Sequence, residues 1–511
     1  MSIVKNRHSR APETSPANRQ ARLLVSSVIS LTDSEDKITI FWTLLRICVI
    51  LQAEMEDGSK AQIRRFNELT TGDPHRLVTK FAVPSIITML ISNVYNMVDT
   101  FYVGRIDTQS TAALGIVFSY MAMIQAIAFF FGQGSGNYIS RALGRRDTEN
   151  ASVMASVGLI SALAVGCVLA LSCSFFLNPL LRFFGSTETI LPYAADYFKW
   201  ILPGTPFIIG CFALNNQMRQ QGNAMMSMIG IASGAVLNIA IDPLFIFTMD
   251  MGVSGAGLAT FISQTASFFL MLFLSGKRGG LGIRLRDFKP SLYMYREIAA
   301  GGLPSLLRQG FGAVAAICLN QVASRYGDSS VAAFSIVNRC MMLAGAAMIG
   351  YGQGFQPVCG FNYGAKLYDR VRKAFWGCVK VSTIYCAVMA VAGVVFAPEI
   401  IRIFRADDLE VVRMGTEILR WQCFSFPLLG FVIITNMYLQ NIRRTVPAIL
   451  VSSARQGLFL IPVLYAGTAL FGFRGLETAQ CVSDILSFLL SFPLCISALR
   501  AMGTSRDAAT L

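Results

Sequence analysis

Long apolar segments recur along this chain from residue 81 to residue 499, and short polar segments separate them. A helix needs about 20 mostly apolar residues to cross the hydrocarbon core of a bilayer, and about a dozen of these segments reach that length. The chain is 54% hydrophobic and 14% charged, whereas soluble globular chains carry roughly 25% charged residues. A soluble fold would have to bury every segment, so we predict an all-α integral membrane protein with twelve transmembrane helices.

The charged loops between the apolar segments predict the orientation. The expected helices lie near residues 81–103, 111–135, 152–176, 191–215, 225–248, 254–275, 297–323, 330–356, 373–397, 412–438, 446–470 and 475–499. Lys and Arg gather in alternate loops, around Arg145, Lys277, Lys366 and Arg443, and such loops face the cytoplasm. We therefore expect a multi-pass protein of the inner (plasma) membrane with both termini cytoplasmic. The same loops carry much of the net charge of +14, so no nucleic-acid partner is expected.

The two halves of the chain repeat with a constant offset of 220 residues. Pro84-Ser85 recurs as Pro304-Ser305, and Gly132-Gln133-Gly134 recurs as Gly352-Gln353-Gly354. Each half holds an even number of helices, so the repeats are parallel and related by an axis along the membrane normal. We predict two six-helix lobes around a central cleft, an arrangement that suits alternating access to a site near the midplane.

We expect five regions along the chain. They are an N-terminal segment at 1–60, a first lobe at 61–275, a cytoplasmic linker at 276–295, a second lobe at 296–500 and a cytoplasmic tail at 501–511. Residues 1–36 are rich in Ser, Arg and Asn, which is typical of disorder. The apolar stretch 38–51 contains Arg46 and is too short to span a bilayer. It is either an interfacial helix or sequence upstream of a true start at Met55, and we favour the second interpretation.

The chain lacks the motifs of nucleotide-driven pumps and of metal chemistry. The glycine-rich runs 132–136 and 350–354 have no phosphate-loop lysine and are typical of close helix packing in membranes. His8 and His75 lie outside the expected helices, so no metal-ligand cluster is available. Because no nucleophile–base pair is evident either, we expect neither an enzyme nor a bound cofactor, and any pumping must use an ion gradient or a separate subunit.

Two carboxylates lie inside expected helices of the first half, where an ionised group is costly. Asp99 is three residues from Asn96, and Asp242 is four residues from Asn238 and precedes Pro243; both spacings put the pair on one helix face. The two helices run in the same direction, so the acids could meet at one depth. Because neighbouring carboxylates in an apolar cavity disfavour each other's ionisation, the cluster could carry a proton, or hold sodium with nearby amide and hydroxyl oxygens. The alternative is that each aspartate caps a helix end in water.

The second half does not repeat these acids. The offset of 220 puts Leu319 and Pro462 opposite them, so we expect ion coupling in the first lobe only. The second half instead carries within its helices Arg308, Arg339, Arg455 and Asp484. Arg455 and Asp484 lie on adjacent antiparallel helices, and we predict that they form a structural ion pair.

Four segments carry a resemblance to a known family, and their order and spacing together are specific. They are residues 95–104 (YNMVDTFYVG), 237–247 (LNIAIDPLFIF), 252–260 (GVSGAGLAT) and 302–310 (GLPSLLRQG). The chain resembles the multidrug and toxic compound extrusion (MATE) family and is most similar to its bacterial DinF/MepA-like branch. The resemblance covers about residues 65–500, and residues 1–54 have no counterpart.

The resemblance implies roles for particular residues. In the branch that the chain resembles, a cation site uses the residues that correspond to Asp99, Asn238, Asp242 and Thr260. A proline whose helix bends with ion binding corresponds to Pro84. Tyr95 and Asn215 match positions near the drug cavity, and we add Asn96 as a third candidate for substrate contact. Other branches place coupling acids in the seventh and tenth helices, where this chain has only Glu417, near an outer end.

The function that the resemblance implies is secondary active multidrug efflux. We expect an antiporter that exchanges cationic or amphiphilic small molecules for protons or sodium by alternating access, and thereby exports xenobiotics such as antibiotics. The expected partners are the lipid bilayer and small organic cations, with the protein a monomer. The alternatives are a lipid-linked precursor flippase of the same superfamily, which typically has fourteen helices, and a non-transporting receptor or scaffold.

Overall fold

The computed structural model describes residues 58–277, 279–405 and 408–507, and within these ranges the regular structure is helical throughout. The apolar stretch 38–51 and Met55 lie outside the described residues. The elements of the first half are α3 (Gly58–Thr71), α4 (Pro74–Val103), α5 (Thr108–Gly144), α6 (Thr148–Phe175), α7 (Leu177–Phe183), α8 (Leu191–Gln220), α9 (Ala224–Pro243), the π-helical turn η2 (Leu244–Thr248) and α10 (Gly252–Ser275).

The second half follows after the short 3₁₀ turn η3 (Leu285–Asp287). Its elements are α11 (Leu292–Ala323), η4 (Ser324–Tyr326), α12 (Asp328–Gly364), α13 (Tyr368–Val395), α14 (Ala397–Phe404), α15 (Leu409–Asn441), α16 (Thr445–Ser453), the π-helical turn η5 (Ala454–Leu458), α17 (Leu460–Phe471) and α18 (Phe473–Asp507). Twelve spans in the described part of the chain are long and apolar enough to cross a membrane. The prediction of twelve transmembrane helices is therefore confirmed.

Most helices begin earlier than the apolar segments suggest, because capping residues precede the apolar run. Asp73 accepts a hydrogen bond from the backbone N–H of Arg76 at the start of α4, where Pro74 occupies the first turn. Asp107 caps α5 in the same way through Ser110. Caps of this kind satisfy backbone donors that have no partner inside the helix, so polar first turns extend the helices beyond the apolar window.

Several helix ends differ from the expected boundaries. α11 begins at Leu292, inside the segment predicted as a linker, and α18 continues to Asp507, inside the predicted tail. α3 overlaps the last residues of the predicted N-terminal segment. Arg141 and Arg219, which we placed with the charged loops, are buried in α5 and α8 instead. Short amphipathic or capped turns leave too little apolar sequence for a hydropathy pattern to detect.

The two halves repeat in structure as they do in sequence. The bounds of α12 and α13 are those of α5 and α6 displaced by 220 residues. Where α5 meets α12, a Cβ on Gly144 would strike the carbonyl oxygen of Phe361, and a Cβ on Gly364 would strike that of Arg141. These four positions are two pairs related by the offset, so the contact is self-complementary and the repeats are parallel.

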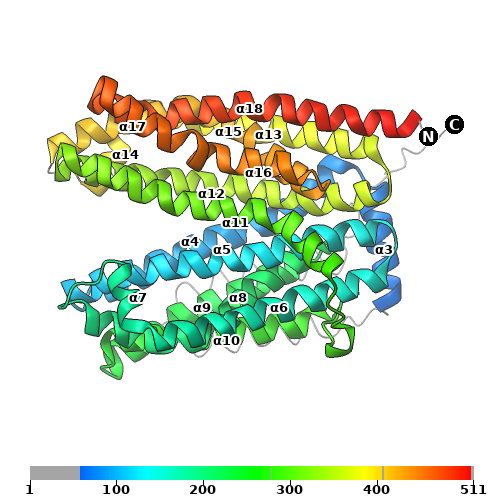
Figure 1. Cartoon of the computed structure of the whole chain (residues 1–511), viewed down its shortest axis with the longest axis horizontal. Helices are drawn as coiled ribbons and strands as arrows, with labels where there is room; N and C mark the ends of the chain where they lie inside the picture. Colours follow the sequence, from blue (N-terminus) through cyan, green and yellow to red (C-terminus); the bar gives the residue numbers. More distant parts are fainter. Residues whose placement is uncertain (1–57, 278, 406–407, 508–511) are drawn as a thin grey trace, which may run out of the picture. The chain divides into compact units, whose positions relative to one another are not determined.

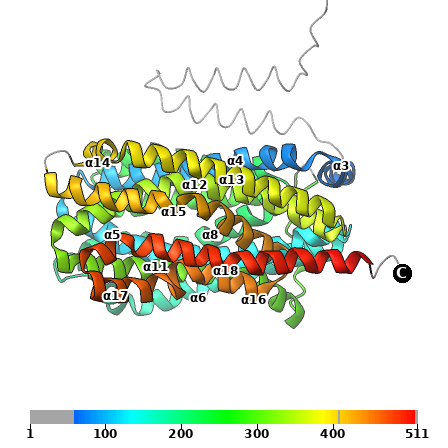
Figure 2. The same cartoon turned by 90° about the horizontal axis from the view of Figure 1, so that it is seen from above.

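The long helices run along one common direction in both views (Figures 1 and 2). In Figure 1 the helices from α4 to α10 form one layer, and those from α12 to α18 form the other. α12 packs against α4, and α11 packs against α5, so the halves meet through these four helices. The two ends of the described chain, α3 and the end of α18, lie at the same end of the bundle (Figure 1).

Candidate functional site

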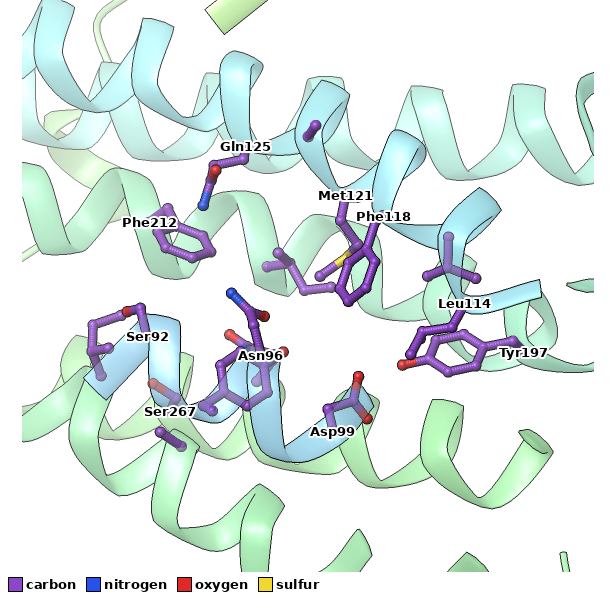
Figure 3. A pocket seen from close by; sticks show the side chains of 17 residues that line it. Ser92, Asn96, Asp99, Leu114, Phe118, Met121, Gln125, Tyr197, Phe212 and Ser267 are labelled. Carbon is purple, nitrogen blue, oxygen red and sulfur yellow. The ribbon is translucent and has the colours of Figure 1, made fainter. Parts of the chain in front are cut away.

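A pocket of about 180 Å³ lies among the helices of the first half. Its lining comes from α4, α5, α8, α9 and α10. On α4, residues at a spacing of three or four put Ser92, Asn96 and Asp99 on one face of the helix, and all three line the pocket (Figure 3). Phe118 and Phe212 add aromatic surface on the other side. The pocket is therefore a partly apolar chamber with one acidic wall.

Asp99 is the acidic group of this wall. It is 3% exposed, and its Oδ1 atom has no hydrogen-bond partner among the described residues. Its carboxylate lies beside the Tyr197 side chain (Figure 3), and the two groups interact electrostatically. A buried carboxylate without a full set of donors is costly in a membrane protein, so such a group usually serves transport or proton relay.

Asp242 lies behind the pocket wall on α9 and is completely buried. The side-chain amide of Asn238 donates a hydrogen bond of 3.1 Å to its Oδ1 atom. The other oxygen, Oδ2, and the amide oxygen of Asn238 have no hydrogen-bond donor in the described part of the chain. Asp99 and Asp242 are close enough to interact electrostatically, so the structure brings the two acids of separate helices together.

Thr260 on α10 completes the set of residues that the resemblance singled out. Its side chain is 1% exposed, and its hydroxyl lies 3.4 Å from the hydroxyl of Tyr197. Tyr197 therefore lies between Thr260 and Asp99. Four candidate residues from three helices, α4, α9 and α10, thus surround one buried region.

The donor set of this region suits a small cation or a proton. Unpaired acceptor oxygens lie on Asp99, Asn238 and Asp242, and carboxylate, amide and hydroxyl oxygens are the ligands of hard cations. A proton added to either carboxyl would supply the missing donor for a neighbouring oxygen. The described residues hold no group of three or more His, Cys, Asp and Glu suited to a transition metal.

The candidates for substrate contact separate into two places. Tyr95 and Asn96 line the pocket, and the Asn96 side chain projects into it (Figure 3). Asn215 is not among the lining residues; it is 3% exposed, and its amide donates a hydrogen bond of 2.6 Å to Ser227. Hydropathy and spacing could not reveal this difference, because the facing of a residue within a bundle depends on its neighbours.

Pro84 lies inside α4, which continues unbroken on both sides of it. The residues around it pack against glycines of α12: a Cβ on Gly354 would strike Ala82, and a Cβ on Gly350 would strike Ile86. A proline in a helix interior removes one backbone hydrogen bond and weakens the helix locally. The weak point of α4 therefore lies where the two halves touch.

The predicted ion pair of the second half is present, with Arg455 Nε 2.9 Å from Asp484 Oδ1. Sequence reasoning missed Tyr197 and Gln264, which line the pocket beside Asp99. It also missed Glu297, a buried acid at the start of α11. Gln264 and Glu297 are polar residues in or beside apolar helices, so the signal used for Asp99 was also available for them.

Comparison with known proteins identifies the family. The family model described as MatE matches residues 84–244 and 304–466, more than half of the chain. The chain belongs to the MATE family. It is a membrane transporter and not an enzyme, with the family's fold of two six-helix lobes around a central cleft.

Individual MATE relatives agree with this assignment. The multidrug export protein MepA of Staphylococcus haemolyticus (strain JCSC1435) is 28% identical over 418 residues, which cover 81% of this chain and 91% of the relative. MepA of Staphylococcus aureus (strain MSSA476) is 27% identical over 80% of this chain and 90% of its own length.

Solved MATE structures share the fold. An outward-facing multidrug resistance MATE transporter of the MOP superfamily matches with a TM-score of 0.80 and 27% identity, covering 85% of this chain and 98% of that one. A MATE crystal structure in a straight conformation matches with the same score and identity, covering 86% and 98% of the two chains.

Proposed function

We propose that this MATE protein is a secondary active multidrug efflux antiporter that exchanges cationic or amphiphilic small molecules for protons or sodium. The observation that carries the proposal is the meeting of Asp99 and Asp242, two buried carboxylates with unpaired oxygens, at the wall of a membrane-embedded pocket. The name of the MepA relatives, multidrug export protein, supports the substrate class.

Coupling requires that the ion change the relative stability of two conformations. In the proposed cycle, an ion entering from outside neutralises the cluster of Asp99, Asn238, Asp242 and Thr260. The loss of charge weakens the hold of the Asp99 wall on a cationic substrate, and α4 bends near Pro84 to displace the substrate outward.

Contacts at one end of the bundle support alternating access with this structure as the outward-facing state. The buried carboxylate of Glu297 on α11 pairs with Arg141 of α5 at 3.0 Å and with Arg443. Gln356 of α12 donates to Gln133 of α5 at 3.1 Å. These bonds close the halves together at the end with the charged loops, and they must break for substrate to enter from that side.

The remaining expectations belong to the same proposal. The end closed by Glu297 faces the cytoplasm, as do both termini, and the protein resides in the plasma membrane as a monomer. The lobes at 61–275 and 296–500 move as units about the linker at 276–295. Alternate loops rich in Lys and Arg support this orientation.

The test measures efflux of a fluorescent organic cation from everted membrane vesicles under separately imposed proton and sodium gradients. We expect gradient-driven transport by the wild-type protein and its loss, to background, in Asp99→Asn at equal expression. The matched control is Asp196→Asn, which makes the same change at an exposed position of α8 and is expected to transport normally.

Full export by Asp99→Asn would refute the coupling mechanism. A wild-type protein that moves no cation of a broad panel under either gradient would refute the antiporter. Lipid transport would then be measured, although twelve spans rather than the fourteen typical of flippases do not favour that activity.

A further inference from the structure

A second cavity, of about 470 Å³, lies among the helices of the second half. Its walls come from α11, α12, α15, α16, η5 and α18, with Ala122 of α5 facing it from the first half. Arg308 and Arg455 line it, and no aspartate or glutamate does. We call it the arginine cavity. Its charge is opposite to that of the pocket that contains Asp99.

The counter-charge of Arg455 is already fully engaged. Asp484 is 1% exposed, and its Oδ1 atom accepts hydrogen bonds from Arg455 at 2.9 Å and from Gln480 at 2.8 Å. Its Oδ2 atom accepts a hydrogen bond of 3.0 Å from Ser425. Asp484 therefore neutralises Arg455 and has no oxygen left for a second cation.

Arg308 has no such partner. It forms neither an ion pair nor a hydrogen bond with any residue that the structure describes, and it lies near the middle of the span Leu292–Tyr326. A charge at this depth is costly unless it is paired or hydrated. The arginine cavity thus carries one positive charge that no described group balances, at the depth where transporters bind their substrates.

The other walls suit an amphiphilic ligand. Gln309, Asn338 and Gln456 offer amide donors, while Met341 and Met342 offer flexible apolar surface. Arg455 bonds to Asp484 through Nε, which leaves its two terminal nitrogens without hydrogen bonds among the described residues. It lies on the π-helical turn η5, an irregularity that is frequent at functional sites.

We propose that the arginine cavity binds the anionic oxygen group, a carboxylate or sulfonate, of an amphiphilic molecule that the protein exports, with Arg308 as its principal ligand. A guanidinium group binds such oxygens through two parallel hydrogen bonds. The proposal rests on the export function proposed above and extends its substrates from cations to zwitterions and anionic amphiphiles.

The test compares rhodamine B, which carries a free carboxylate, with its ethyl ester, which does not. Initial transport rates are measured in phosphatidylcholine liposomes under the driving gradient. In Arg308→Gln we expect KM for rhodamine B to rise by at least about tenfold relative to KM for the ester. Arg308→Lys, which keeps the charge but loses the bidentate geometry, is expected to fall between the two. The control is Arg339→Gln, at an exposed position of α12 outside the cavity, with an unchanged KM ratio.

An unchanged KM ratio in Arg308→Gln, or an equal loss of both dyes, would overturn the proposal. If the wild-type protein transports neither dye, the export function fails instead. Binding of rhodamine B to the purified protein, measured by fluorescence anisotropy, then still tests the cavity, because Arg308→Gln must weaken it relative to the ester.

A phospholipid head group offers the same oxygen chemistry from the bilayer. Repeating the measurement with phosphatidylglycerol in the liposomes separates the two sources. We expect no inhibition of rhodamine B transport. Inhibition by phosphatidylglycerol that disappears in Arg308→Gln would place a lipid in the cavity and overturn the assignment to an exported molecule.

Discussion

At the scale of single residues, the two halves differ most in the sign of their buried charge. The first half holds Asp99 and Asp242 beside its pocket, whereas the second half holds Arg308 and Arg455 in its cavity. The repeat preserved the helices but not these side chains. Because each charge is costly in a membrane, the difference implies that the two halves bind different chemical groups.

The hydroxyl of Thr260 distinguishes sodium from proton coupling, because a bare cation needs oxygen ligands and a proton on a carboxylate does not. We expect Thr260→Val to need about tenfold more sodium for half-maximal sodium-driven export, as a lost ligand worth about 1.4 kcal/mol would require. Proton-driven export by the same variant keeps its wild-type pH dependence.

A matched control is Thr205→Val. Thr205 is equally buried, and its hydroxyl bonds to Tyr120 at 2.9 Å, so this variant loses a tyrosine contact away from the acids. Its sodium requirement should equal that of the wild type. The same sodium requirement in all three proteins would contradict a cation site that includes Thr260.

At the scale of elements, α4 combines the functional face with a built-in weakness. Asp99 lies near one end of the helix, and Pro84 lies fifteen residues earlier, on the part that packs against Gly350 and Gly354 of α12. Close backbone contact at glycines leaves no side chain to absorb a movement. A bend at Pro84 would therefore change the contact between the halves as well as the position of Asp99.

We expect Pro84→Ala to raise the unfolding temperature and to lower export about tenfold. The substitution restores a backbone donor inside α4, and an interior proline costs a helix about 3 kcal/mol, a bias large enough to hold the helix straight. Thermal unfolding in detergent and vesicle transport measure the two effects.

Pro74→Ala supplies the comparison, because Pro74 occupies the first turn of the same helix, where a missing N–H costs little. Both properties should stay close to wild type there. Normal transport by Pro84→Ala would show that bending at this proline is not part of the cycle.

At the scale of the whole molecule, the contacts between the halves are nearly but not fully symmetric. α5 and α12 meet at positions related by the offset of 220 residues. Gly354 meets Ala82 of α4, whereas its counterpart Gly134 meets Ile298 of α11, which corresponds to position 78. The two contacts thus differ by four residues, about one helical turn, so α4 and α11 are displaced differently against the opposite half.

The ion network around Glu297 should control the balance between the two open states. Removing one partner of a buried pair is strongly destabilising, by about 3–5 kcal/mol, and Glu297→Gln removes the charge that Arg141 and Arg443 share. We expect a severalfold larger fraction of long distances between spin labels at positions 145 and 365, measured by electron paramagnetic resonance in a cysteine-free background.

The control is Glu188→Gln, which removes an exposed ion pair with Arg182 within the first half. Exposed pairs contribute about 0–1 kcal/mol, so its distance distribution should match the wild type. An unchanged distribution in Glu297→Gln as well would mean that the network does not hold this end closed.

The sequence by itself determined the number of spans, the parallel repeat and the presence of buried acids. Hydrocarbon thickness requires a minimum apolar length, and duplication leaves a constant offset, so both are visible in local patterns. The tertiary structure alone decided which polar groups meet. Arg141 and Glu297 are 156 residues apart in the chain, and Asn215 and Asn96, both amides in apolar helices, face different surroundings. The absence of a described partner for Arg308 likewise depends on helices brought together only by packing, which local sequence does not encode.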